Sequence, residues 1–322
     1  MLLKRIATNK IALPLTVSFL LCTRLSLAQA ATRPMAISER AESESRAIQS
    51  AAARHATDDE LGKLWGQLAS DYLNELEMPQ AEQAYDHALK LLSKYVATRH
   101  DYAVALDGLG TLYGQIGRMA ESENCHRKAL AIFDAEGDLT YSLALHANLA
   151  VLMQNEGRSK DAEKEASTAI EGMLGQARID ASDLASAFIA RGYARCRQRR
   201  CKEGLSDADQ AVDIVRAYLP PNSLLAAGSW SALGYMQWKT GDGAGAEEKM
   251  RRALEILSDK SDLPYPVLVA ARIRTFRQFQ QFLNETRRKQ EAQQIGDEMA
   301  RLKREQAPVC RNCTVNVEGL SK

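Results

Sequence analysis

The sequence has few of the residues and patterns on which most enzymes depend. It contains five histidines, and none of them lies in a metal-binding or nucleophile-activating motif. It has no phosphate-cradling glycine loop, dinucleotide-binding fingerprint or nucleophile elbow. We therefore predict that the protein is not an enzyme and has no catalytic residues, no cofactor and no metal site.

Long apolar runs are also scarce, and the one prominent run lies near the N-terminus. Residues 11–21 are mostly apolar, follow three basic residues, and precede Ala28-Gln29-Ala30, which has the form of a cleavage signal. This layout is typical of a secretory signal peptide and is too short to span a bilayer. We expect export to the periplasm or out of the cell, with an uncleaved N-terminal anchor as the alternative. Because no later stretch is apolar enough to span, we expect no stable membrane insertion after cleavage.

Neither sign of charge dominates the chain. The formal net charge is +1, and removal of residues 1–30, which carry four basic residues and no acid, would leave a charge of about −3. A mildly acidic protein has no general attraction to nucleic acids or anionic membranes. We therefore expect no nucleic-acid partner.

Small residues recur at near-constant intervals over residues 61–303. Five segments align on one pattern, a Leu-Gly or similar pair, then a large residue, a Gly and several Ala at fixed offsets, although the fourth has Arg191 in place of the Leu and Arg199 in place of the Gly. A degenerate sixth copy of the repeat follows. Apolar residues three and four positions apart make each segment helical. The second residue of the pair falls at Ala69, Gly110, Ala150, Gly192 and Gly234, and at Gln280 in the sixth copy.

This pattern resembles the tetratricopeptide repeat, and its period of roughly 42 residues is similar to that of the kinesin-light-chain subtype. The string Asn148-Leu149-Ala150, followed by Gly157-Arg158, carries the subtype likeness. The resemblance implies an all-α fold, a right-handed superhelical solenoid of about six antiparallel helix pairs. The small pairs would lie where the two helices of a unit cross. Gly117, Gly157 and Gly241 would end first helices in a left-handed conformation.

The repeat divides the chain into four predicted parts. These are a cleavable signal peptide at 1–30, a leading helix or spacer at 31–60, the solenoid at 61–303 and a tail at 304–322. The leading helix is expected at about residues 36–55. The sixth unit is rich in Arg and Gln, which suits a terminal unit with a solvated outer face.

The resemblance also implies a binding groove, because the concave side of such a solenoid is lined mainly by first helices. The lining positions are small and polar in the early units but aromatic and basic in units four and five. Rings beside cations are typical of a binding hot spot. The alternative is that the rings only pack against the next unit. The candidate groove residues are Asn148, Gln154, Asn155, Tyr193, Arg197, Tyr235, Trp238 and Lys239.

Basic residues gather at residues 191–202, an exception in an otherwise acidic mature chain. They could bind an anionic peptide or polymer, or they could form a solvated turn whose long side chains cover apolar surface. The members of this segment are Arg191, Arg195, Arg197, Arg199, Arg200 and Lys202.

Two pairs of cysteines are candidates for disulfides. Cys196 and Cys201 flank the turn of unit four, where Arg199 replaces the usual Gly, and they either form a bond across it or remain free thiols. Cys310 and Cys313 form a C-x-x-C in the tail. A small-loop disulfide is favoured there over redox catalysis, which needs a strand and helix around the motif, and over zinc, which needs two more ligands.

Together these features predict a non-catalytic scaffold that holds a peptide or protein segment in the concave groove. The alternative is a structural component of an envelope or secretion assembly that binds through convex or end surfaces. A basic, aromatic groove would favour the first function, and an apolar exposed end or face would favour the second. The sequence does not define the oligomeric state.

Overall fold

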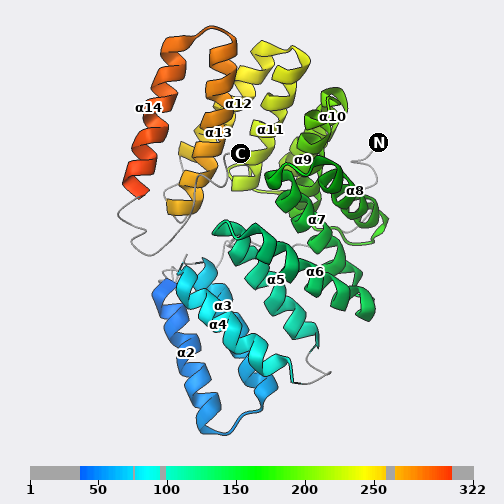
Figure 1. The fold of residues 1–322 in the computed structure, drawn as a ribbon, viewed down its shortest axis with the longest axis vertical. Helices are drawn as coiled ribbons and strands as arrows, with labels where there is room; N and C mark the ends of the chain where they lie inside the picture. The colour runs from blue at the N-terminus through cyan, green and yellow to red at the C-terminus, as the bar shows by residue number, and fades with distance from the viewer. Residues whose placement is uncertain (1–36, 75–76, 95–98, 259–264, 307–322) are drawn as a thin grey trace, which may run out of the picture. The chain divides into compact units, whose positions relative to one another are not determined.

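The computed structural model describes residues 37–74, 77–94, 99–258 and 265–306 (Figure 1). Within these ranges every regular element is an α-helix, which confirms the predicted all-α class. The predicted signal peptide at 1–30, and Cys310 and Cys313 in the tail, lie outside the described residues.

The helices fall into two compact units that divide between Asp138 and Leu139. Each helix pair consists of two consecutive helices packed side by side, as the resemblance implies. The N-terminal unit contains α2 (Ile37–Ala53), α3 (Asp58–Asn74), α4 (Met78–Leu92), α5 (Arg99–Gln115) and α6 (Met119–Glu136). The C-terminal unit contains α7 (Leu139–Glu156), α8 (Ser159–Gly175), α9 (Ala181–Arg197), α10 (Cys201–Tyr218), α11 (Leu224–Thr240), α12 (Gly243–Ser258), α13 (Tyr265–Glu285) and α14 (Lys289–Gln306).

The turn inside a helix pair has one recurring geometry. Gly117, Gly157 and Gly241 have φ angles of 84°, 81° and 99°, the left-handed conformation predicted for them. Arg199 and Arg287 adopt it in the turns of the fourth and sixth repeat units, the helix pairs α9–α10 and α13–α14, with φ angles of 65° and 64°. For a residue other than glycine this conformation costs about 1 kcal/mol. The turns of units four and six are therefore held by the contacts around them and not by glycine.

The small residues of the repeat lie where paired helices cross. A Cβ atom at Gly234 would lie 2.9 Å from the carbonyl oxygen of Ala246 on the partner helix. At Gly192 it would lie 3.0 Å from the carbonyl oxygen of Gly204. Backbones this close leave no room for a side chain, so the recurring small pair sets the helix–helix distance.

The helices of the C-terminal unit form two layers (Figure 1). The first helices α7, α9, α11 and α13 pack directly on one another in that order. The second helices α8, α10 and α12 pack mainly on the first helix of their own pair and on that of the next. Because the first helices lie closer together than the second helices do, they form the inner wall of this unit.

The outer surfaces are polar. Leu139 is the only large hydrophobic residue exposed in the described part of the chain. The terminal helix α14 buries Ala292 and Leu302 and turns charged and amide side chains outward, as expected for a last unit. None of the helices that the structure describes is long and apolar enough to cross a bilayer.

Candidate functional site

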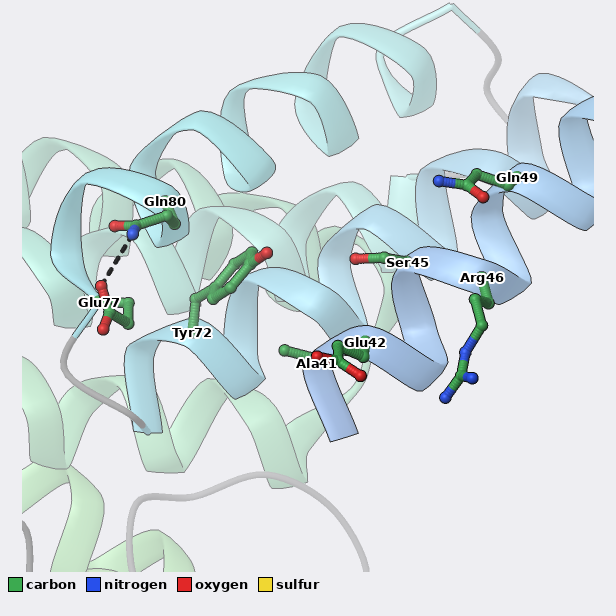
Figure 2. Close-up of a pocket in the computed structure, with 8 residues that line it drawn as sticks. All are labelled: Ala41, Glu42, Ser45, Arg46, Gln49, Tyr72, Glu77 and Gln80. Atoms are coloured by element: carbon green, nitrogen blue, oxygen red, sulfur yellow. Dashed lines mark hydrogen bonds between the residues drawn. The ribbon is translucent and has the colours of Figure 1, made fainter. Parts of the chain in front are cut away.

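An open hollow of about 520 Å³ lies in the N-terminal unit (Figure 2). It is formed by α2, by Tyr72 near the end of α3 and by the start of α4, where the Gln80 amide donates a 2.8 Å hydrogen bond to Glu77. The lining is mostly polar and includes two glutamates and an arginine. Its lining residues are Ala41, Glu42, Ser45, Arg46, Gln49, Tyr72, Glu77 and Gln80.

The aromatic residues predicted for the groove come together on the inner wall of the C-terminal unit. The rings of Tyr193 on α9 and Tyr235 on α11 have centroids 5.3 Å apart. Trp238 follows at 5.8 Å from Tyr235, and Phe282 of α13 at 6.0 Å from Trp238, both edge-to-face. We call these four residues the aromatic cluster. Tyr193, Tyr235 and Trp238 are half-buried, so their rings pack against neighbouring units and also reach the surface.

A row of hydrogen bonds crosses the same three helices. The amide nitrogen of Gln278 on α13 donates to the hydroxyl oxygen of Tyr193 over 2.9 Å. The hydroxyl of Ser231 on α11 donates to the amide oxygen of Gln278 over 2.8 Å. Gln278 thus ties α13 to both α9 and α11. The sequence did not identify it, because the sixth unit has lost the repeat signature that would show which residues face inward.

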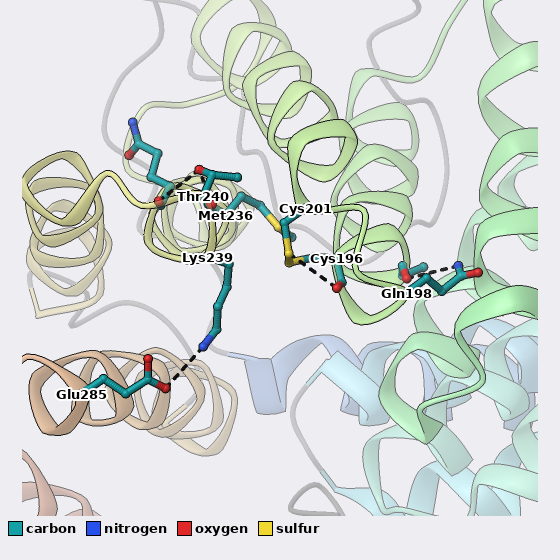
Figure 3. The surroundings of a disulfide bond; sticks show 9 residues. Cys196, Gln198, Cys201, Met236, Lys239, Thr240 and Glu285 are labelled. Atoms are coloured by element: carbon teal, nitrogen blue, oxygen red, sulfur yellow. Dashed lines mark hydrogen bonds and ion pairs between the residues drawn. A yellow bond between two sulfur atoms is a disulfide. The ribbon is translucent and has the colours of Figure 1, made fainter.

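Lys239 is already engaged by its neighbours. Its ammonium lies 3.3 Å from the centre of the Trp238 ring and 3.4 Å from a carboxylate oxygen of Glu285 (Figure 3). Cation–π contact and ion pairing both favour this position. Lys239 therefore covers one face of Trp238 and is not a free cation.

The remaining predicted groove residues lie at the edge of the aromatic cluster. Arg197 is exposed, and its guanidinium donates a 2.6 Å hydrogen bond to the backbone carbonyl oxygen of Gln154 at the end of α7. Asn148 and Asn155 are half-buried on α7, one helix further along the wall. The bond from Arg197 links the edge of the cluster to α7 through the backbone of Gln154.

Half of the basic segment at 191–202 is neutralised by acids that the sequence gave no reason to pair with it. Asp207 accepts hydrogen bonds from Arg191 at 2.8 Å and from Arg195 at 2.9 Å. Glu163 of α8 binds Arg195 at 3.0 Å and Arg200 at 2.9 Å. Although burial opposes the effect, these hydrogen bonds hold the pKa of Glu163 below its ordinary value. Arg191, Arg195 and Arg200 thus connect α8, α9 and α10.

Cys196 and Cys201 form a disulfide across the turn of unit four (Figure 3). Their Cα atoms are 3.9 Å apart, and Cys196 is buried against Met236 in a small core cluster. The bond encloses Arg199, which adopts the left-handed conformation without being glycine. The disulfide therefore restrains a turn that the sequence alone disfavours.

Replacing both cysteines with serine is expected to lower the free energy of unfolding by roughly 2 kcal/mol, because a closed loop has less conformational entropy to lose on folding. Urea unfolding followed by far-UV circular dichroism would measure the loss. A reductant should reproduce it in the wild-type chain and leave the double variant unchanged. Equal stability of the wild-type chain with and without reductant would contradict the prediction.

The comparisons with known proteins agree with this architecture. The family model described as tetratricopeptide repeat matches residues 60–135. No curated protein matches the sequence. Residues 60–135 fall in the N-terminal unit, so the assignment of the C-terminal unit rests on its fold.

Solved structures with the same fold cover most of the described chain. The apo form of RapI has a TM-score of 0.69 at 12% identity, covering 84% of this chain and 94% of that one. NprR in complex with its cognate peptide NprX has a TM-score of 0.59 at 16% identity, with coverage of 82% and 74%. Kinesin light chain TPR-like repeats from Podosopora anserina score 0.50 at 17% identity, with coverage of 62% and 96%. Residues 60–135 therefore match the tetratricopeptide repeat, and the chain shares its fold with repeat proteins that include kinesin-light-chain TPR-like repeats.

Proposed function

We propose that the chain is an exported, non-catalytic scaffold that binds a peptide or protein segment on the inner wall formed by α9, α11 and α13. The observation that carries the proposal is the aromatic cluster with its adjoining cations, which spans all three helices. Half-buried rings offer contact area at a small entropic cost, because the packing on one side already fixes them. Export rests on the signal-peptide pattern at residues 1–30.

The similar structures support peptide binding by this fold. NprR, which has the same fold, was solved with its cognate peptide. At 16% identity this likeness concerns the fold and not the ligand. The residues of the wall must therefore supply the specificity in this chain.

The polar outer surfaces favour groove binding over assembly through convex or end faces. Interfaces of permanent assemblies have apolar cores. Among the described residues only Leu139 offers an exposed large hydrophobic side chain, and the outer face of α14 is charged and polar. The described surface therefore provides no apolar patch outside the wall for a permanent interface.

Replacing Tyr235 and Trp238 with alanine together is expected to weaken partner binding by at least about tenfold, because aromatic anchors carry much of the energy of an interface. The loss would be seen in a crosslinking pull-down from the exporting cell, comparing wild-type and variant chains. Far-UV circular dichroism should show nearly unchanged helicity.

Trp230→Ala is the matched control for this experiment. It removes a tryptophan from the same helix that packs against the same core, but the Trp230 ring lies beside Lys249 of α12 and makes no ring contact with the aromatic cluster among the described residues. It should leave the set of captured partners unchanged. A collapse of helicity in the Tyr235/Trp238 variant would show that the rings only pack, and unchanged capture by that variant would refute the proposal.

A further inference from the structure

We infer that the segment bound on this wall is acidic, with carboxylates that pair with Arg197 and Arg274 and an apolar side chain that packs on Tyr235 and Trp238. The inference rests on the proposed function and names the chemical class of its ligand. It is carried by two features of the wall: the register of the helices, which places both arginines beside the aromatic cluster, and the lack of a carboxylate partner for these arginines within the described ranges.

The register places both arginines beside the aromatic cluster. Residues four positions apart lie on one face of a helix. Arg197 follows Tyr193 at that spacing on α9, and Arg274 precedes Gln278 at that spacing on α13. Since Gln278 is hydrogen-bonded to Tyr193, the two arginines lie on the same wall and flank the tyrosine.

These two arginines differ from Arg191, Arg195 and Lys239 on the same three helices in having no acid beside them. Arg197 and Arg274 are exposed, and neither has a carboxylate partner within the described ranges. Among the described residues, the Arg197 guanidinium donates its hydrogen bond to a neutral backbone carbonyl. Lys239, by contrast, is paired with Glu285. The wall therefore carries an unbalanced positive charge.

The charged residues of the three helices also favour an anionic ligand. Together α9, α11 and α13 contain only two acidic residues, Asp183 and Glu285. Seven basic residues lie on the same helices: Arg191, Arg195, Arg197, Lys239, Arg272, Arg274 and Arg277. Arg191, Arg195 and Arg272 pair with acids of neighbouring helices and Lys239 pairs with Glu285, whereas Arg197 and Arg274 have no carboxylate partner among the described residues. In a chain that is otherwise close to neutral, this local excess favours an anionic partner.

The hydrogen-bonding groups left available are donors. Burial raises the pKa of Tyr193 to about 12, so its hydroxyl keeps its proton. That hydroxyl accepts a hydrogen bond from the amide nitrogen of Gln278 over 2.9 Å and donates one to the amide oxygen over 3.3 Å, and Ser231 donates to the same oxygen. The two guanidinium groups are therefore the donors on this wall that need further acceptors. A carboxylate supplies acceptors only and forms charge-assisted bonds with arginine.

An acidic protein segment fits this wall better than a nucleic acid does. Bases bind by stacking on open ring faces. Lys239 covers a face of Trp238, and Tyr235 meets Trp238 edge-to-face with an interplanar angle of 86°. The rings thus form an irregular apolar surface, suited to an aliphatic or aromatic side chain next to a carboxylate.

The test uses a short fluorescent peptide of glutamates interspersed with leucine and phenylalanine, titrated with the full chain in a fluorescence-anisotropy assay. A second probe has glutamine in place of every glutamate. We expect the glutamate peptide to bind at least about tenfold more tightly than the glutamine peptide, since each ion pair with arginine is lost in the latter.

Arginine variants test whether the preference for the glutamate peptide comes from the wall. The double variant Arg197→Ala with Arg274→Ala should bind the glutamate peptide about tenfold or more weakly, without changing its affinity for the glutamine peptide. Arg178→Ala with Arg216→Ala is the matched control, because it removes two exposed arginines that lie off the three helices. It should bind both probes like the wild-type chain. Circular dichroism would verify that all variants fold.

Three results would overturn the acidic-ligand inference: equal affinity for the two peptides, no measurable binding of the glutamate peptide, or tighter binding of single-stranded DNA. Failure of the proposed function looks different. In that case Tyr235→Ala with Trp238→Ala would leave partner capture intact, whatever the charge preference of the chain.

Discussion

Replacing Asp207 with alanine is expected to lower the free energy of unfolding by roughly 3 kcal/mol, because removal of one member of a buried ion pair leaves the other charge uncompensated. Asp207 is 3% exposed and binds two guanidinium groups, those of Arg191 and Arg195. Neither arginine can move fully into water without disturbing the packing of α9 against α10. The variant would leave Arg191 without an acid and Arg195 with Glu163 alone.

Urea unfolding followed by circular dichroism would measure the effect, with Asp209→Ala as the matched control. Asp209 lies on the same helix, but its side chain is exposed, so its loss should change stability by less than about 0.5 kcal/mol. If both variants were equally stable, the ion pairs of Asp207 would make no measurable contribution to the free energy of unfolding. Asp207→Asn should fall between them, because the amide oxygen still accepts from one arginine.

Replacing Gly204 with alanine is expected to cost about 2–3 kcal/mol, although alanine normally favours a helix. A Cβ atom there would lie 2.6 Å from the carbonyl oxygen of Gly192, and backbone cannot rotate away as a side chain does. The helices α9 and α10 would have to separate. The separation would also weaken the contacts of Met236, which lies 3.3 Å from the same Cβ position.

Gly228→Ala provides the opposite control for this experiment. Gly228 lies inside α11, and a Cβ atom added there meets nothing within 4 Å. Its replacement should raise stability by up to about 1 kcal/mol through helix propensity. A stabilising effect at both glycines would mean that α9 and α10 are less closely packed than the structure indicates.

The sequence predicted the helix pairs well because their determinants are local. Gly117, Gly157 and Gly241 end first helices because a left-handed residue is needed there, and that requirement can be read from one position. The leading helix, expected at about residues 36–55, is observed as α2 at Ile37–Ala53, and His55 takes the left-handed conformation two residues beyond its end. Crossing points follow from the small pairs in the same way.

The site was harder to anticipate because its partners are distant in sequence. From the sequence, the segment at 191–202 could be an anion-binding patch or a solvated turn, whereas in the structure Asp207 and Glu163 neutralise half of it from other helices. Gln278 and Arg274 were not predicted as site residues. The sixth repeat unit has lost most of the repeat signature, so its sequence does not show which residues face the wall. The binding role of Tyr193, Tyr235 and Trp238 stays a prediction, since half-buried rings suit both packing and recognition.

The bond between Cys196 and Cys201 has a practical consequence for work on this protein. A chain produced in a reducing cytoplasm would lack the bond, and its α9–α10 turn would be free to fray at the end that carries Arg197. Ligand affinities measured on such material would describe a different surface from that of a chain oxidised after export. Recombinant protein intended for binding studies should therefore be secreted, or its thiols counted before use.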